Sequence, residues 1–292
     1  MIWLTGSNGM LGKELSIHFK NEGFLFTGTD REVDIIDYSA LLSYSKNYPV
    51  QWIINCAAYT AVDKAEDEEE TCRLLNITGP YNIARLSKEL NAKLIHISTD
   101  FVFNGKGNKP YTEDDKTDPI GVYGLSKRDG EIMVLNENEK SFIIRTAWLY
   151  GKYGNNFVNT MLRLFNEKER ISVVNDQKGS PTWANELAKV IVELMKFSDN
   201  GISVPYGIYN YTNEGEITWH DFAKEIYRQA LNLRILEKEC EIKPCASADF
   251  PSKATRPSYS VLDKAKIKKA LGINIPEWEK SLNSFLFSIK NR

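Results

Sequence analysis

The chain has few of the residues on which most metal and nucleophile sites depend. It holds three histidines and four cysteines in 292 residues, and the cysteines show no C-x-x-C spacing. This scarcity argues against a zinc site, a disulfide scaffold and a histidine-based triad. Lys and Arg total 37 against 39 Asp and Glu, a net charge of −2. The excess positive charge typical of proteins that bind nucleic acid or anionic membranes is therefore missing.

Long hydrophobic runs and a leader-like segment are missing as well. No apolar stretch approaches the ~18 residues of a membrane span, and the first residues show neither a basic region nor a cleavage site. We therefore expect a cytoplasmic protein with reduced thiols, and no membrane or nucleic-acid partner. The 42% hydrophobic and 26% charged residues are typical of a globular protein.

Short apolar runs alternate with amphipathic segments through the first half of the chain. Continuous apolar strands separated by helices pair in parallel and are covered on both faces. The pattern therefore predicts an α/β fold with a Rossmann-type, doubly wound parallel sheet. The expected strands lie at residues 2–4, 24–26, 52–54, 94–97 and 142–144, and helices are expected after the first strand and at about 38–47, 64–91 and 121–138.

The pattern becomes less regular after about residue 150, which predicts a smaller, irregular domain packed on the first. Thr218 has the character of a helix N-cap, and the acidic run 66–70 is expected at a solvated helix start, where the macrodipole favours negative charge. Helices are expected near 155–168, 184–197, 219–231, 263–271 and 277–289, and strands at 171–174 and 207–211.

Three glycines follow the first strand with G-x-x-G-x-x-G spacing, at Gly6, Gly9 and Gly12. Gly6 would allow a tight turn, and Gly9 would let backbone N–H groups approach a pyrophosphate at the helix N-terminus. Gly12 would let the helix pack closely on the sheet. The spacing differs from the commoner G-x-G-x-x-G fingerprint, and a purely structural turn also fits it. Its place between a strand and a helix favours a dinucleotide site.

The end of the second strand carries two signals that disagree about the cofactor. Asp30 is placed to bond the adenosine ribose hydroxyls, which favours NADH. Arg31 is placed to accept a 2′-phosphate, which favours NADPH, so both cofactors remain open. Asp34 and Ile35 follow where the adenine edge would lie, and Asp37 equally fits a helix N-cap.

Tyr123 and Lys127 form a Tyr-x-x-x-Lys pair near the start of a predicted helix. The i, i+4 spacing puts both on one face, where an ammonium would lower the tyrosine pKa toward the range of a general acid. Residues 98–100, Ser-Thr-Asp, follow the fourth strand, and ligands bind at the carboxyl ends of such strands. A hydroxyl there can donate to a substrate carbonyl, although a turn or cap also fits. Small residues within 55–59 suit a nearby dinucleotide.

Together these motifs resemble the extended short-chain dehydrogenase/reductases and, within them, the dTDP-4-dehydrorhamnose reductase family. The resemblance covers essentially the whole chain and implies two interleaved domains. One is a dinucleotide-binding domain of residues 1–150 plus about 182–212, and the other a small sugar-nucleotide domain of about 151–181 plus 213–292. The motifs that carry the resemblance are residues 55–66, 98–103, 122–124, 145–150, 154–158, 175–182 and 256–260.

The resemblance assigns roles to the residues of the reacting centre. Tyr123 resembles the general acid that protonates the C4 oxygen, and Lys127 the residue that binds the nicotinamide ribose and tunes Tyr123. Thr99 resembles the hydrogen-bond donor to the carbonyl, with Asp100 beside it on the sugar. Trp148 resembles the aromatic residue that covers the hexose, although a core tryptophan also fits its position.

The resemblance also implies a cofactor shell for NADPH or NADH and a set of contacts to the nucleotide-sugar. Asn156, Gln177 and Arg256 lie in motifs near the nucleotide-sugar without individual roles. The cofactor shell comprises Gly6, Gly9, Met10, Leu11, Gly12, Asp30, Arg31, Asp34, Ile35, Ala57, Ala58 and Tyr59, together with Tyr123 and Lys127.

The implied activity is NAD(P)H-dependent reduction of the C4 ketone of dTDP-4-dehydro-L-rhamnose to dTDP-L-rhamnose. This is the last step of dTDP-rhamnose biosynthesis for cell-surface polysaccharide. The alternatives are another nucleotide-sugar reductase or epimerase of the superfamily, and a non-catalytic regulatory subunit. Phe101 stands where related dehydratases carry a second acid, and the intact Thr99, Tyr123 and Lys127 argue against a dead enzyme.

Some family members dimerise around a divalent metal such as Mg²⁺, held by glutamates of both subunits. Two of those positions are Glu14 and Glu186 here, but the third aligns with Ser288. We therefore predict that no metal bridges two subunits, and expect a monomer or a homodimer.

Overall fold

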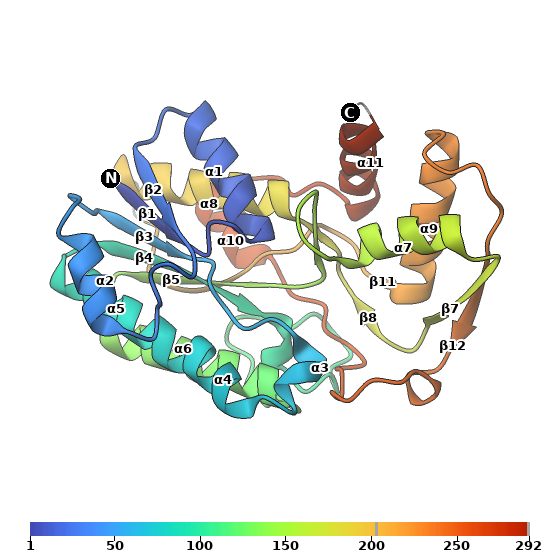
Figure 1. The fold of residues 1–292 in the computed structure, drawn as a ribbon, viewed down its shortest axis with the longest axis horizontal. Coiled ribbons are helices and arrows are strands. Elements are labelled where there is room, and N and C mark those ends of the chain that lie inside the picture. Colours follow the sequence, from blue (N-terminus) through green and yellow to red (C-terminus); the bar gives the residue numbers. More distant parts are fainter. Residues whose placement is uncertain (202–203, 291–292) are drawn as a thin grey trace.

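A six-stranded parallel sheet forms the centre of one lobe, in the order β10-β5-β4-β3-β1-β2. The computed structural model describes residues 1–201 and 204–290 of the chain (Figure 1). Strand β2 is added on one side of β1, whereas β3, β4, β5 and β10 are added in turn on its other side. This order confirms the doubly wound fold and puts its switch point between β1 and β3. The strands are β1 (Ile2–Thr5), β2 (Phe26–Thr29), β3 (Trp52–Asn55), β4 (Lys93–Thr99), β5 (Ser141–Thr146) and β10 (Gly207–Asn210).

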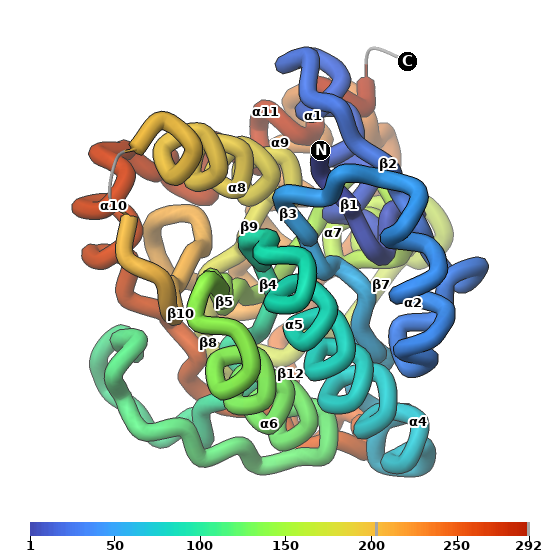
Figure 2. The backbone as a smooth tube through the Cα atoms, turned by 90° about the vertical axis from the view of Figure 1, so that its left-hand side faces the viewer, coloured from blue at the N-terminus to red at the C-terminus, as the bar shows by residue number. Residues whose placement is uncertain are grey.

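Helices cover both faces of this sheet (Figures 1 and 2). Leu15 and Ile191 belong to the apolar cluster on one face, and Leu41 and Ile83 to the cluster on the other. This double cover explains why the strands have nearly continuous apolar sequences. The first face carries α1 (Met10–Asn21), α8 (Ala184–Asp199) and α10 (Ala265–Leu271), and the second carries α2 (Tyr38–Ser45), α5 (Gly79–Glu89) and α6 (Val122–Glu137).

The second lobe has its own apolar cluster, which includes Phe165, Phe222 and Phe285. Thr218 caps its longest helix as predicted, because its Oγ1 accepts from the Asp221 N–H at 3.1 Å. The lobe contains α7 (Phe157–Glu167), α9 (Trp219–Asn232), α11 (Trp278–Lys290), the parallel pair β7 (Arg170–Val174) and β12 (Glu241–Cys245), and the antiparallel pair β8 (Lys178–Gly179) and β11 (Ile217–Thr218).

The two lobes alternate along the chain, and the exact domain boundaries stay a prediction. The parallel pair β6 (Leu149–Tyr150) and β9 (Thr182–Trp183) lies where the chain passes between them. Helix α10 falls inside the range 213–292 of the small domain, yet its Ile267 and Leu271 lie in the apolar cluster of the sheet lobe. No helix among the described residues combines the length and the apolar content needed to span a membrane.

The helical segment expected at about 64–91 is confirmed, but it is not one regular α-helix. It forms α3 (Val62–Ala65), α4 (Glu69–Arg73), the π-helix η1 (Leu74–Thr78) and then α5. Within η1, Asn76 accepts from the Tyr59 N–H at 2.9 Å and donates to the Tyr59 carbonyl at 3.0 Å. Such π-helical insertions are frequent at functional sites, and this one clamps the backbone that follows β3.

Strand β2 also begins two residues later than expected. The pairing with β1 places Phe26 opposite Ile2, whereas Leu25 is 79% exposed. The two-residue strands were not predicted, because two residues show no periodicity.

Candidate active site

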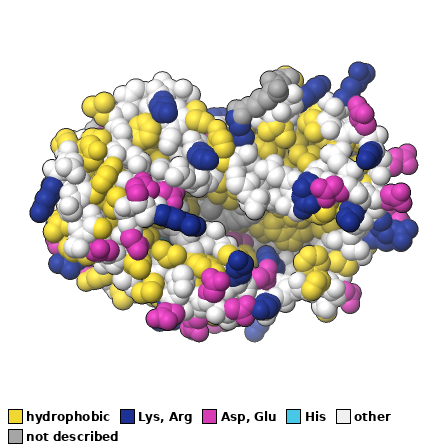
Figure 3. All heavy atoms as spheres, viewed as in Figure 1, with side chains coloured by type: hydrophobic (Ala, Val, Ile, Leu, Met, Phe, Trp, Pro, Cys, Tyr) yellow, Lys and Arg dark blue, Asp and Glu magenta, His cyan; other side chains and the backbone are white. Residues whose placement is uncertain are grey.

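A cleft of about 440 Å³ lies at the carboxyl ends of β1, β3, β4 and β5. The space-filling view shows a hollow between the two lobes (Figure 3). The cleft brings together residues that lie far apart in the sequence, as expected at the switch point of a doubly wound sheet. The predicted site residues that line it are Gly9, Met10, Leu11, Gly12, Ala58, Thr99, Asp100, Tyr123, Lys127 and Trp148.

The glycine turn is built by close backbone approaches. Gly6 has φ +68°, and a Cβ there would lie 2.6 Å from the Ala57 nitrogen. A Cβ on Gly12 would lie 2.3 Å from the Gly6 carbonyl oxygen, so Gly12 lets α1 pack on the turn itself. The first turn of α1 carries no acidic side chain. Its free N–H groups and positive dipole end therefore suit an anion such as a pyrophosphate.

The residues expected around the adenosine follow the same edge outside the cleft. Asp30 accepts from the backbone N–H of Asn8 at 3.1 Å and of Arg31 at 3.0 Å. Its carboxylate thus lies beside the glycine turn. Asp34 accepts from the Ile36 N–H at 3.0 Å. Ile35 is buried and packs closely on Gly79 of α5, so its side chain belongs to the core.

Helix α6 carries the tyrosine and the lysine, and β4 supplies the hydroxyl. Lys127 is 2% exposed, and its Nζ donates to the Ile97 carbonyl at 2.7 Å. Thr99 donates from Oγ1 to the Asp100 carboxylate at 3.0 Å. Tyr123 lines the same cleft as Lys127, Thr99 and Asp100. One cleft therefore holds a proton donor, a cation and a hydroxyl.

Burial dominates the protonation of this cluster. Burial raises the pKa of Tyr123, the Thr99 hydroxyl opposes the rise, and the charge of Asp100 adds to it. The predicted lowering of this pKa is therefore wrong, because burial has the largest effect and Lys127 donates to Ile97 rather than to the phenol. Burial also lowers the pKa of Lys127 to about 8. A phenol with a raised pKa is fully protonated at neutral pH, as a proton donor requires.

The acidic run 66–70 is exposed to solvent as expected, and two of its residues also contact distant segments. Glu66 accepts from the Val122 N–H at 3.0 Å and so caps the first turn of α6, which carries Tyr123. Glu68 accepts from the Tyr59 hydroxyl at 2.7 Å. Only the end of the run starts α4. A carboxylate at a helix N-terminus is favourable for the macrodipole, but a contact between segments so distant in sequence leaves no local pattern.

A second cavity of about 650 Å³ lies between α7, β7, α9 and residues 247–256, and both Gln177 and Arg256 line it. Gln177 donates to Ser247 at 2.8 Å, and Arg256 pairs with Asp63 at 2.9 Å. Asn156 lines neither hollow. Its amide caps α7 by accepting from the Asn159 N–H at 3.0 Å and donates to the Gly151 carbonyl at 2.8 Å.

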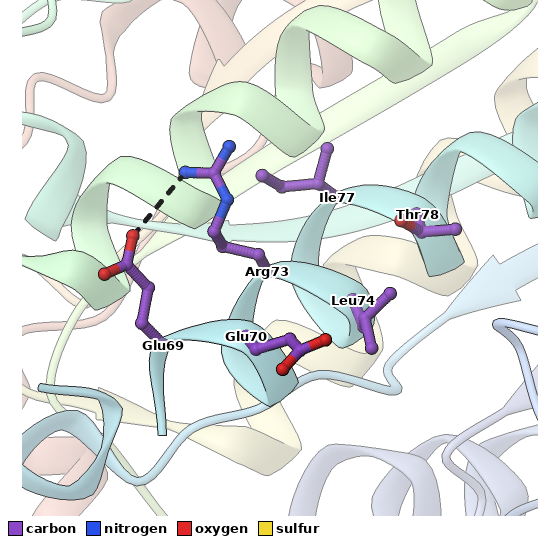
Figure 4. Close-up of a pocket in the computed structure, with 6 residues that line it drawn as sticks. All are labelled: Glu69, Glu70, Arg73, Leu74, Ile77 and Thr78. Carbon is purple, nitrogen blue, oxygen red and sulfur yellow. Dashed lines mark ion pairs between the residues drawn. The ribbon is translucent and has the colours of Figure 1, made fainter. Parts of the chain in front are cut away.

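A third hollow, of about 560 Å³, lies on α4 and η1 at the surface (Figure 4). Arg73 and Glu69 form an ion pair of 3.9 Å across it, and both side chains are about half exposed. Exposed ion pairs of this kind contribute little free energy. The six lining residues include none of the predicted site residues, so we assign no catalytic role to this hollow.

Comparisons with known proteins agree with this geometry. A model of the RmlD substrate binding domain family matches residues 1–291. A dTDP-4-dehydrorhamnose reductase of Aggregatibacter actinomycetemcomitans is 38% identical over 283 residues, 96% of each chain. The chain belongs to the dTDP-4-dehydrorhamnose reductase family. The family predicted from the motifs is thereby confirmed.

Solved structures of this family also have the same fold over nearly the whole chain. The reductase of Clostridium acetobutylicum has a TM-score of 0.92 at 36% identity and covers 99% of both chains. The reductase of Bacillus anthracis, solved in complex with NADP, has a TM-score of 0.91 at 38% identity and covers 98% of both. The Rossmann-type fold is therefore shared with dTDP-4-dehydrorhamnose reductases.

The positions that match the metal-holding glutamates of some family members, Glu14, Glu186 and Ser288, each have a partner within this chain. Glu14 accepts from Asn185 at 3.3 Å, and Glu186 pairs with Lys189 at 3.1 Å. Ser288 donates to a carbonyl of its own helix. Within the described ranges, no group of three or more His, Cys, Asp and Glu side chains is placed to hold a metal ion.

Asp100 should make the fold depend on pH in a defined window. Asp100 is 2% exposed, and burial raises its pKa from 3.8 to about 6. The folded chain then holds the proton more tightly than the unfolded chain. Protonated Asp100 therefore contributes to the free energy of unfolding at low pH, and this contribution is lost as pH rises from 3.8 to about 6.

We therefore expect Asp100→Asn to raise the free energy of unfolding at pH 8 by on the order of 1–3 kcal/mol. Little change is expected at pH 4, where Asp100 of the folded wild type is protonated and therefore neutral, as Asn is. Thermal unfolding at the two pH values measures the effect. A variant that is destabilised equally at both would show that the charge of Asp100 carries no penalty in the fold.

Proposed function

We propose that this protein reduces the C4 ketone of dTDP-4-dehydro-L-rhamnose to dTDP-L-rhamnose with NADPH or NADH, the last step of dTDP-rhamnose biosynthesis. The observation that carries this proposal is the cleft that joins the N-terminus of α1 to Thr99, Tyr123 and Lys127. Membership of the dTDP-4-dehydrorhamnose reductase family supports the choice of substrate.

The cleft fits a nicotinamide dinucleotide. The N-terminus of α1 would hold the pyrophosphate, because its N–H groups and dipole attract an anion. Lys127 would hold ribose hydroxyls, and Ala58 leaves room at the end of β3. When bound, the nicotinamide supplies the hydride. The relative from Bacillus anthracis was solved with NADP, whereas Asp30 and Arg31 of this chain point to different cofactors, so we propose either form.

The chain's own residues would manage the charge that develops on the ketone oxygen. Thr99 and Tyr123 would both donate hydrogen bonds to that oxygen, which stabilises it as it becomes negative. Tyr123 would then transfer its proton and complete the alcohol. The ring of Phe101 lies edge-on to Tyr123, with centroids 5.5 Å apart. An apolar ring in that position does not supply the second acid that a dehydratase would use.

The substrate is thus proposed to be a small nucleotide-sugar, with the second cavity beside the cleft available for its nucleotide part. We further propose a cytoplasmic enzyme that is a monomer or a homodimer. The four cysteines are all free thiols, which suits a reducing compartment.

One assay tests the proposed function and the choice of cofactor together. Purified protein is mixed with dTDP-4-dehydro-L-rhamnose, generated by the upstream epimerase, and oxidation of NADPH and NADH is followed in parallel. We expect oxidation with at least one cofactor, and the ratio of the two kcat/KM values gives the preference. Binding of substrate without oxidation of either cofactor would contradict a reductase.

A further inference from the structure

Trp148 adopts a backbone conformation that a bulky residue rarely has. Its φ is +47°, in the left-handed region. A large side chain stays in that region only where its surroundings hold it there, and such positions cluster at functional sites. Trp148 lines the cleft beside Thr99 and Tyr123. The contacts of its ring should therefore show what holds it.

Two residues of the second lobe hold the indole ring. Trp219 stacks on Trp148 with ring centroids 3.4 Å apart and planes within 9°. Gly179 lies against the face of the same ring, where a Cβ would be 2.5 Å from Cε2, 2.6 Å from Nε1 and 2.8 Å from Cζ2. Only glycine leaves space for the indole at this position. Together Trp219 and Gly179 form a slot that Trp148 fills.

The stacked pair also lies where the two hollows meet. Trp148 lines the cleft with the reacting groups, and Trp219 lines the second cavity with Gln177 and Arg256. Trp219 is the first residue of α9 and packs on Phe157 of α7, with centroids 4.5 Å apart. The second lobe therefore sets the position of Trp219. Because Trp219 stacks on Trp148, it also sets the position of Trp148.

We propose that Trp219 is a positioning residue for the nucleotide-sugar and acts through Trp148. The slot of Trp219 and Gly179 fixes the indole of Trp148 at the lining of the cleft, where the hexose would contact it. This rests on the proposed function, because the hexose is the group that Trp148 would contact. Trp219 itself is not among the residues that line the cleft with Thr99 and Tyr123.

The test measures steady-state kinetics for Trp219→Ala, Trp219→Phe and Gly179→Ala, with Trp52→Phe as control. Trp52 lies at the start of β3, the end of the sheet away from the cleft. We expect Trp219→Ala and Gly179→Ala to raise KM for the nucleotide-sugar by about 3- to 10-fold. KM for NAD(P)H should stay unchanged. Trp219→Phe should recover most of the loss, because it keeps a flat ring.

A double-mutant cycle separates positioning from general packing. If Trp219 acts through Trp148, Trp219→Ala should add nothing to KM in a Trp148→Ala background. An equal loss in both backgrounds would overturn the proposal. So would an unchanged KM in Gly179→Ala, in which the aromatic cluster of the second lobe is intact.

Circular dichroism tests the stacking of Trp148 and Trp219 without relying on enzymatic activity. Two stacked indoles give an exciton couplet in circular dichroism, which Trp219→Ala and Trp148→Ala should both remove and Trp52→Phe should leave. A couplet that survives Trp219→Ala would refute the stack even if the wild type proved inactive. Inactivity of the wild type with an intact couplet would instead refute the proposed function.

Discussion

Tyr123→Phe should lower kcat for ketone reduction by about 10²–10⁴-fold, the usual effect of losing a positioned proton donor. The phenol is the proposed donor of the cleft, and because burial raises its pKa it carries its proton at neutral pH. The substitution removes one oxygen and keeps the ring that packs edge-on against Phe101. The fold and the binding of NAD(P)H should therefore be retained, and the loss should fall on kcat.

Single-turnover kinetics with saturating cofactor measure this effect directly. Tyr48→Phe is a matched control, because Tyr48 packs on Tyr44 among the residues around α2, outside the cleft. If Tyr123→Phe reduced the ketone at the wild-type rate, the proton would have to come from another group. Thr99 and Asp100 would then be the next candidates, since both line the same cleft.

Lys127→Met should lower kcat/KM by about 10- to 10²-fold, because the proposed charge-assisted hydrogen bond to the cofactor is lost. The wild type should also lose kcat/KM as pH rises through about 8, where the ammonium of the free enzyme gives up its proton. This alkaline decline should follow a single ionisation. It should be absent from the residual activity of the Met variant.

The stability of the same variant shows whether the loss is chemical or structural. Burial lowers the pKa of Lys127 from 10.5 to about 8, so the folded chain binds the proton less tightly than the unfolded chain. Stability from this group is therefore lowest below pH 8 and rises with pH toward 10.5. At pH 7, Lys127→Met removes this penalty and should not lower the melting temperature. A large decrease would mean that the hydrogen bond to Ile97 supports the fold.

Several parts of this protein could be predicted because they are local. The order of strands and helices follows from the apolar pattern, and Gly6 turns directly after β1. Tyr123 and Lys127 share a helix face because four residues make about one turn. The family motifs could be recognised as well, because each is a contiguous segment of the chain. Each of these inferences needs only residues close together in the chain.

The sequence by itself determined the fold class, the glycine turn and which side chains are proposed to react. The tertiary structure decided how those side chains are tuned and held. It set the pKa of Tyr123 through burial, directed Lys127 to Ile97, and capped α6 with Glu66, a contact across 56 residues. The physical reason is that burial and partner choice depend on which distant segments pack together, whereas local periodicity records only which face of an element is apolar.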